Sequence, residues 1–287
     1  MNPWVAGARP RTLPASVVPV LVGTACAAGE GDVVAWRALA AGVVALALQI
    51  GTNYANDYSD GVRGTDAARV GPVRLVASGL KAPAAVKRAA FAAFGVAAVA
   101  GLALALATSL WLIAVGAACI AAGYLYTGGP KPYGYLGLGE VFVFVCFGLV
   151  ATVGSTYVQI ERITGLSVVA ATAVGFLSCA LLVANNLRDI PTDAAAGKKT
   201  VAVRLGDRRT RGLYADLLIG AFLVGLVCMA WRWGAIACLV AAPFALDPIR
   251  RVLTGARGRE LIAVLVGTGR AQLVFGATFS LGLWLTA

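Results

Sequence analysis

The 287-residue sequence contains no histidine and few charged residues of either sign. The absence of histidine removes the commonest general base and the usual protein ligand of haem and of zinc. Only 13% of the residues are charged, whereas an average soluble domain carries about 25%. This scarcity of charge, with 60% hydrophobic residues and a mean hydropathy of +0.83, excludes an ordinary soluble domain and predicts an integral membrane protein.

The sequence also lacks any cysteine spacing that is typical of a metal site or a disulfide framework. Its cysteines all lie inside long apolar stretches, at Cys26, Cys119, Cys146, Cys179, Cys228 and Cys238. Free cysteine is among the most buried residue types and packs as a small apolar side chain. We therefore predict buried thiols without disulfides. Since histidine is also absent, any catalysis is expected to use carboxylates, cations and a metal.

Long apolar stretches are abundant. They recur at residues 12–29, 36–55, 89–107, 110–127, 138–158, 166–187, 212–230, 233–249 and 262–285. A helix needs ~20 apolar residues to cross a bilayer. The first stretch lacks a clean signal-peptide cleavage site and similar stretches follow it, so we interpret it as a span. The pattern predicts an all-α integral membrane fold with about nine transmembrane helices.

The distribution of positive charge predicts the orientation in the membrane. If the N-terminus is cytoplasmic, 20 of the 24 lysines and arginines fall on the cytoplasmic side of the predicted spans. Short cytoplasmic loops carry such an excess, so we expect a multi-pass protein of the cell (inner) membrane with its C-terminus outside. Topology then explains the net charge of +11 without a nucleic-acid partner.

Two clusters of acidic and amide side chains interrupt the apolar sequence, one after the second predicted span and one after the sixth. The first contains Asn53, Asn56, Asp57, Asp60 and Asp66, and the second contains Asn185, Asn186, Asp189 and Asp193. Because four spans separate the clusters, both are expected on the cytoplasmic face. Their spacing also faintly suggests one domain, 1–287, made of two similar halves, roughly 12–127 and 138–249, plus a ninth helix at 262–285.

Helical spacing decides which of these side chains share a face. Asn53, Asn56 and Asp60 recur at helical intervals and share a face with Asp57, if the helix continues that far. In the second cluster, Pro191 is expected to kink or end the helix between Asp189 and Asp193.

The clusters predict a magnesium site. A carboxylate near hydrocarbon costs roughly 2.5–3.5 kcal/mol unless something compensates it. Mg²⁺ prefers oxygen ligands and is usually held by one or two carboxylates plus substrate phosphates. We therefore predict Mg²⁺, two ions for two clusters, carrying a diphosphate. The predicted metal ligands are Asn56, Asp57, Asp60, Asp66, Asp189 and Asp193. Asp60→Asn and Asp189→Asn are each expected to lower turnover by orders of magnitude with folding intact.

Further residues complete the predicted site. The diphosphate contacts are Asn53, Arg69, Arg74, Lys131, Asn185, Asn186, Lys198 and Lys199. Lys131 is singled out because it carries the one charge of a tight loop rich in glycine and proline. It joins Asp60, Asp189 and Glu140 in the predicted catalytic set, where Glu140 orients or deprotonates a substrate hydroxyl. Tyr124 and Tyr126 fit either an aromatic belt at the membrane interface or, with Arg11, a substrate cavity in which the rings stabilise an allylic cation or stack on an aromatic acceptor.

Taken together, these motifs resemble the UbiA superfamily of intramembrane aromatic prenyltransferases along nearly the whole chain. They are RPRTLPAS at 9–16, NDYSD at 56–60 with GTD at 64–66, GPVRL at 71–75, the loop at 126–131, GLGE at 137–140, NNLRD at 185–189 and GKKT at 197–200. The superfamily's first motif reads Asn-Asp-x-x-Asp-x-x-x-Asp. Gly64 stands where its last acid belongs, and Asp66 follows two residues later.

The resemblance implies a helical bundle around a central cavity that opens to the cytoplasmic side and laterally to lipid. It further implies that a polyprenyl diphosphate ionises between the two clusters and that its allylic carbon attacks an aromatic ring. Within the superfamily, the sequence looks most like the branch of menaquinone biosynthesis that acts on 1,4-dihydroxy-2-naphthoate. For that branch the products are demethylmenaquinone, carbon dioxide and diphosphate.

Three other functions fit part of the pattern. A prenyltransferase of the same fold takes another aromatic acceptor, such as 4-hydroxybenzoate, and spacing alone does not separate the two. A CDP-alcohol phosphotransferase also has a membrane-face acidic motif, but Gly64-Thr65 stand where that motif requires Ala-Arg. A transporter with duplicated halves would place its charges at the middle of interrupted spans, whereas these charges gather at one face.

Overall fold

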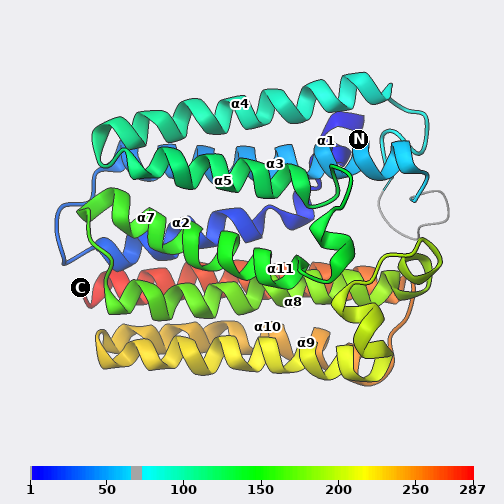
Figure 1. Cartoon of the computed structure of the whole chain (residues 1–287). Helices are drawn as coiled ribbons and strands as arrows, with labels where there is room; N and C mark the ends of the chain where they lie inside the picture. The colour runs from blue at the N-terminus through cyan, green and yellow to red at the C-terminus, as the bar shows by residue number, and fades with distance from the viewer. Residues whose placement is uncertain (1, 66–72) are drawn as a thin grey trace.

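The computed structural model describes residues 2–65 and 73–287, which form a bundle of roughly parallel and antiparallel helices (Figure 1). The first helices are α1 (Pro3–Ala8), α2 (Pro14–Ala27), α3 (Ala35–Arg63), α4 (Pro83–Ala107) and α5 (Trp111–Leu125). One rod then combines α6 (Gly139–Val143), a π-helical segment (Phe144–Val150) and α7 (Ala151–Ile160). The remaining helices are α8 (Gly165–Ala195), α9 (Val201–Val227), a 3-10 segment (Trp233–Ala241) leading into α10 (Ala242–Leu253), and α11 (Glu260–Leu285).

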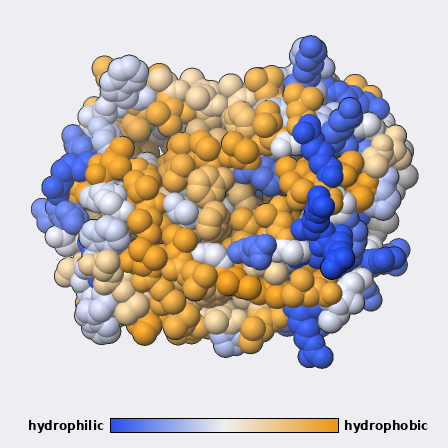
Figure 2. Space-filling view, turned by 60° about the horizontal axis from the view of Figure 1, so that its bottom comes forward, coloured by the Kyte–Doolittle hydropathy of each residue, from blue (hydrophilic) through white to orange (hydrophobic). Residues whose placement is uncertain are grey.

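Every apolar stretch predicted from the sequence lies in helical structure. Within the described ranges, six helices are long and apolar enough to cross a membrane: 35–63, 83–107, 139–160, 165–195, 201–230 and 260–285. Helices α2 and α5 are also apolar but shorter. Figure 2 shows a broad hydrophobic band between two hydrophilic ends, with the larger hydrophilic area at the right-hand end. The chain is therefore an all-helical integral membrane protein, as predicted.

Local sequence explains where the functional helices begin and end. Helix α3 continues through Gly61 and ends at Gly64, whose left-handed backbone (φ 74°) closes the helix. Helix α8 begins with a capping box, in which Thr164 and Ser167 each accept a hydrogen bond from the other's backbone N–H. Asn56, Asp57 and Asp60 therefore lie in the last turns of α3, and Asn186, Asp189 and Asp193 lie in the last turns of α8.

The expected break at Pro191 does not occur, since α8 continues as a helix to Ala195. Proline removes one backbone donor, but the last turn has other support. Thr192 Oγ1 donates to Asp189 O at 3.0 Å, and the N–H of Ala196 donates to Thr192 O at 3.0 Å. Asp193 consequently stays on the same helix as Asp189.

Two arginines bind helix ends together at the end of the bundle opposite the acidic clusters. Arg232, which is buried, donates to the carbonyls of Ala25, Cys26, Ala28 and Leu283, at the ends of α2 and α11. Arg37 donates to Ala107 O in α4 and Val158 O in α7. Carbonyls at a helix C-terminus carry partial negative charge, so each guanidinium satisfies several of them at once.

Candidate functional site

The two acidic clusters meet in one polar pocket at the end of the bundle where α3 and α8 terminate. This pocket of about 70 Å³ is lined from both clusters and from the loops beside them, by Arg9, Asn56, Asp60, Thr65, Arg74, Tyr126, Thr127, Gly134, Tyr135, Asn185, Asn186, Asp189, Thr192, Asp193, Lys198 and Thr200. The sequence separates Asp60 and Asp189 by more than a hundred residues, so only the packing of α3 against the second half of the chain brings them together.

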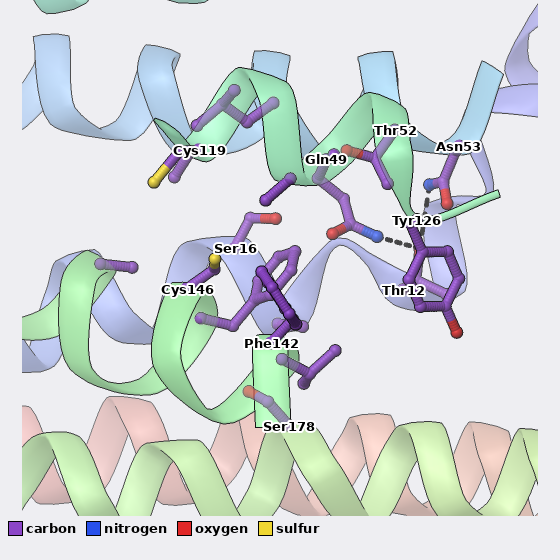
Figure 3. A pocket seen from close by; sticks show the side chains of 18 of the residues that line it. Thr12, Ser16, Gln49, Thr52, Asn53, Cys119, Tyr126, Phe142, Cys146 and Ser178 are labelled. Atoms are coloured by element: carbon purple, nitrogen blue, oxygen red, sulfur yellow. Dashed lines mark hydrogen bonds between the residues drawn. The ribbon is translucent and has the colours of Figure 1, made fainter. Parts of the chain in front are cut away.

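A much larger apolar cavity, of about 670 Å³ (Figure 3), adjoins the polar pocket. Both are lined by Arg9, Asn56, Arg74, Tyr126 and Asn185, which therefore mark the junction. The walls come mainly from α2, α3, α5 and the rod of α6 and α7. Aromatic rings stand near the junction: Tyr133 stacks on Phe142 at 3.9 Å and meets Tyr126 edge to face at 5.5 Å. The site therefore consists of a small polar pocket that opens into a much larger apolar cavity.

Asp60 is the acceptor of a converging set of hydrogen bonds. Its Oδ1 accepts from Tyr135 OH at 2.6 Å, Thr65 Oγ1 at 3.2 Å and Lys198 Nζ at 3.3 Å. Lys198 Nζ also lies 3.9 Å from Asp193 Oδ1 and 4.6 Å from the centre of the Tyr135 ring. One ammonium group thus links a carboxylate of each cluster. Burial, and then the neighbouring Asp60 charge, raise the pKa of Tyr135, which keeps its hydroxyl a donor.

Asp189 forms a buried ion pair with the residue before it. Arg188 Nε and Nη2 donate to the two carboxylate oxygens of Asp189, each at 2.7 Å, and Nη2 also reaches Asn185 Oδ1 at 2.8 Å. The side chains of Arg188 and Asp189 are 1% and 5% exposed. Two parallel N–H···O bonds are the strongest geometry for this pair, so Arg188 fixes the direction of the Asp189 carboxylate.

The amides of the two clusters have different partners. Asn56 Oδ1 accepts from Thr127 Oγ1 at 2.7 Å, whereas Asn186 Nδ2 donates to Glu140 Oε1 at 3.0 Å. Asn56 therefore has its nitrogen available to the pocket, and Asn186 has its oxygen available. Glu140 itself lines neither the pocket nor the cavity, but its partner Asn186 lines the pocket.

Asp57 points away from the pocket, although its sequence position resembles that of Asp60. Its two carboxylate oxygens accept from the backbone N–H groups of Leu75 and Val76 at 2.8 and 2.9 Å, and the residue is fully buried. In this structure Asp57 anchors the segment that follows Arg74.

Asp57→Asn is expected to destabilise the protein by about 2 kcal/mol, because an amide cannot accept both charge-assisted bonds from Leu75 and Val76. Thermal unfolding in detergent measures this effect. The exposed Asp32, at the opposite end, supplies the matched control Asp32→Asn, which should leave the unfolding temperature unchanged. Equal unfolding temperatures for both variants would contradict the anchoring role.

Some predicted site residues lie elsewhere. Asn53 lines the apolar cavity and donates to Ala8 O and Thr12 Oγ1, so it faces the N-terminal segment. Arg11, by contrast, lines the apolar cavity, where the sequence analysis placed it. Lys131 and Lys199 are exposed and line neither space, and Tyr124 packs against Phe91. Asp66 and Arg69 lie outside the described residues.

The sequence analysis missed several residues that line the pocket. Arg9 stands two residues before the predicted Arg11, but nothing in a sequence distinguishes which arginine of such a pair reaches the pocket. Tyr135 and Thr127 come from the loop that was examined for Lys131. Arg63 ties this loop to α3 by donating to the carbonyls of Thr127 and Gly129. The prediction chose Lys131 because it carries the charge of that loop. The contacts to Asn56 and Asp60 are instead made by the hydroxyl groups of Thr127 and Tyr135.

The donor set fits a magnesium ion that arrives with phosphate. Among the described residues, no three His, Cys, Asp or Glu side chains lie close enough together to hold a metal by themselves. The pocket instead presents Asp60, Asp189 and Asp193 beside lysine and arginine. Mg²⁺ usually takes one or two carboxylates and completes its shell with water and phosphate oxygens. The position of Lys198 between Asp60 and Asp193 also indicates that a cation is accommodated there.

The fold and the site together define an integral membrane protein with a charged pocket at the mouth of an apolar cavity. A model of the UbiA prenyltransferase family matches residues 16–265, and the chain belongs to this family. The chain is 57% identical to the 1,4-dihydroxy-2-naphthoate octaprenyltransferase of Mycobacterium tuberculosis, over 95% of this chain and 93% of that protein. It is 36% identical to the Escherichia coli protein of the same name, over 99% and 95% of the two chains.

Solved structures agree on the fold. A UbiA homolog from Archaeoglobus fulgidus bound to GPP and Mg²⁺ superposes with a TM-score of 0.61 at 15% identity, over 96% of this chain and 99% of that one. The match to the family model and to the two relatives confirms the family predicted from the motifs, and with it the prediction that the chain is a prenyltransferase enzyme. The CDP-alcohol phosphotransferase and transporter interpretations are set aside.

Proposed function

We propose that the protein transfers a polyprenyl group from polyprenyl diphosphate to 1,4-dihydroxy-2-naphthoate, with loss of carbon dioxide and diphosphate, giving demethylmenaquinone. One observation supports polyprenyl diphosphate as the donor. Both acidic clusters lie beside cationic side chains in a pocket at the mouth of an apolar cavity. The charged pocket suits a diphosphate and the cavity suits an isoprenoid chain. The relatives named for this acceptor support the choice of naphthoate.

Each part of the pocket then has a role. Lys198, Arg74 and Arg188 neutralise the diphosphate, and Asn56 Nδ2 donates to it. Asp60, Asp189 and Asp193, with Asn186 Oδ1, would hold Mg²⁺. The metal supplies positive charge that stabilises the departing diphosphate. The rings of Tyr126, Tyr133 and Phe142 face the position of the allylic carbon, where π faces stabilise a carbocation and stack on an aromatic acceptor.

Two predicted roles change with the geometry. Glu140 is proposed to orient Asn186 rather than to remove a proton itself, because Asn186 lies between it and the pocket. Asp57 is proposed as the anchor of the segment after Arg74, and its role as a direct metal ligand is not retained. Asp66 and Arg69 stay proposals from the sequence, for the metal and the diphosphate respectively.

The finer topology is also a proposal. Nine helical rods, with α2, α5 and the rod ending in α10 added to the six long helices, span the cell membrane around the cavity. The basic end, which carries the polar pocket and the N-terminus, faces the cytoplasm by the positive-inside rule. The prenyl chain enters between helices from the lipid. The chain forms one domain whose two four-helix halves are followed by α11.

The function is tested by giving membranes that contain the protein a polyprenyl diphosphate and a panel of aromatic acceptors. Mass spectrometry identifies the products. We expect prenylated, decarboxylated product from 1,4-dihydroxy-2-naphthoate, none from 4-hydroxybenzoate, and loss of product when a chelator removes Mg²⁺ until Mg²⁺ is restored. Membranes without the protein are the control. Product from 4-hydroxybenzoate but none from the naphthoate would overturn the acceptor, and chelator-resistant product would overturn the metal.

A further inference from the structure

Among the polar atoms of the residues that line the apolar cavity, Ser16 Oγ and Gln49 Oε1 make no hydrogen bond with the described residues. Ser16 in α2 lines the cavity and is 1% exposed, and no described group lies within hydrogen-bond distance of its Oγ. Gln49 in α3 lines the same cavity and is 8% exposed, and only its nitrogen makes a hydrogen bond within the described chain. Buried polar groups are normally satisfied. A ligand with polar groups of its own would satisfy both atoms.

The orientation of Gln49 is fixed by Thr12. Thr12 Oγ1 donates its one proton to Arg9 O at 2.9 Å, so toward other neighbours it acts as an acceptor. Gln49 Nε2 donates to this oxygen at 3.1 Å. The amide oxygen must then point away from Thr12. Figure 3 shows it directed into the pocket, on the side where Ser16 also extends its hydroxyl.

The depth of Gln49 suits the aromatic acceptor. Gln49 precedes Asn56 by two helical turns, which is about 10 Å at ~1.5 Å per residue. Asn56 lines the polar pocket, where the diphosphate is proposed to bind. The allylic carbon is joined to the diphosphate through one ester oxygen, and both hydroxyls of the acceptor lie on the ring that this carbon attacks, so the hydroxyl on the side away from the diphosphate is directed toward Gln49. Tyr126 and Phe142 stand in the same section of the pocket (Figure 3).

We propose that Gln49 and Ser16 form the subsite that recognises a ring hydroxyl of the aromatic acceptor. Gln49 Oε1 accepts a hydrogen bond from that hydroxyl, and Ser16 Oγ donates a hydrogen bond to the hydroxyl oxygen. A hydroxyl is both donor and acceptor and satisfies both groups. A carboxylate at this position could not donate a hydrogen bond to Gln49. A ring C–H would form a hydrogen bond with neither Gln49 nor Ser16. Thr12 is a positioning residue, since it acts through Gln49. This inference rests on the proposed function and names the residues that determine acceptor specificity.

The test compares 1,4-dihydroxy-2-naphthoate with the two naphthoates that lack one of its hydroxyls, at saturating polyprenyl diphosphate. For each enzyme, the ratio of kcat/KM between the full acceptor and each analogue is measured. Comparing this ratio between enzymes cancels the intrinsic reactivity of the ring. Wild-type protein should prefer the full acceptor over one analogue, and Gln49→Met and Ser16→Ala should each reduce that preference by about tenfold. The KM for polyprenyl diphosphate should stay unchanged.

Gln159→Met is the matched control. Gln159 is also a buried glutamine, but it caps the start of α3 through Val34 N at 2.8 Å and lies outside the cavity. Its replacement should lower stability without changing the acceptor ratio. An undiminished ratio in both Gln49→Met and Ser16→Ala, or equal losses with all acceptors, would overturn the subsite. Failure of wild-type protein to use any naphthoate would instead overturn the proposed function.

Discussion

Asp60→Asn is expected to lower turnover by at least about a hundredfold while the protein still folds. The substitution preserves size and removes the charge on which Tyr135, Thr65 and Lys198 converge. Lys198 keeps Asp193 as a partner at 3.9 Å, so no cation is left alone by the change. Initial rates of prenyl transfer, with thermal unfolding measured on the same preparation, check both halves of this expectation.

Asp247→Asn is the control for Asp60→Asn. Asp247 is an exposed carboxylate paired with Arg251 one helical turn away, at 2.8 Å, and such surface pairs contribute little to stability. Its replacement should leave both turnover and unfolding unchanged. Near-normal turnover of Asp60→Asn would remove this carboxylate from the metal and diphosphate site.

Asp189→Asn is expected to reduce turnover to a similar extent but also to destabilise the protein, by about 3–5 kcal/mol. The reason is Arg188, whose buried guanidinium would lose its carboxylate partner. The sequence alone predicted intact folding for this variant, because it does not reveal the ion pair between neighbouring residues. Thermal unfolding and prenyl-transfer rates are again the measurements.

The double variant Arg188→Met with Asp189→Asn separates the two effects. Removing both charges should recover much of the stability, because no buried charge is left without its partner, whereas turnover should stay low. Equal stability of the wild type and Asp189→Asn would show that the Arg188 pair contributes little. Recovery of turnover in the double variant would show that the reaction needs neither the Asp189 carboxylate nor the Arg188 guanidinium.

Hydrophobic periodicity and charge were sufficient to predict the helices and the meeting of the two clusters. Apolar length fixes the helices, and the even number of spans between Asp60 and Asp189 brings both residues to one end. The direction of individual side chains was less accessible. Asp57 and Asp60 are one helical turn apart, and only the position of the segment at Leu75 and Val76 turns Asp57 away from the pocket.

The other pocket residues could not be predicted because their contacts join distant parts of the chain. Tyr135 reaches Asp60 from 75 residues away, and Thr127 reaches Asn56 from 71 residues away. Neither residue carries a charge or belongs to an acidic motif, so nothing local marks it. Gln49 and Ser16 stand out only when the apolar surroundings and the hydrogen bond to Thr12 are known. The effect of Pro191 on α8 was overestimated, because whether a proline breaks a helix depends on which other hydrogen bonds support the last turn.

The arginine contacts at the end opposite the pocket hold four helix ends together. Arg232 joins the ends of α2 and α11, and Arg37 joins those of α4 and α7. Carbonyls at these C-terminal ends thereby gain donors that the helices themselves do not supply. A prenyl chain whose diphosphate lies in the pocket is expected to extend toward this cross-linked end.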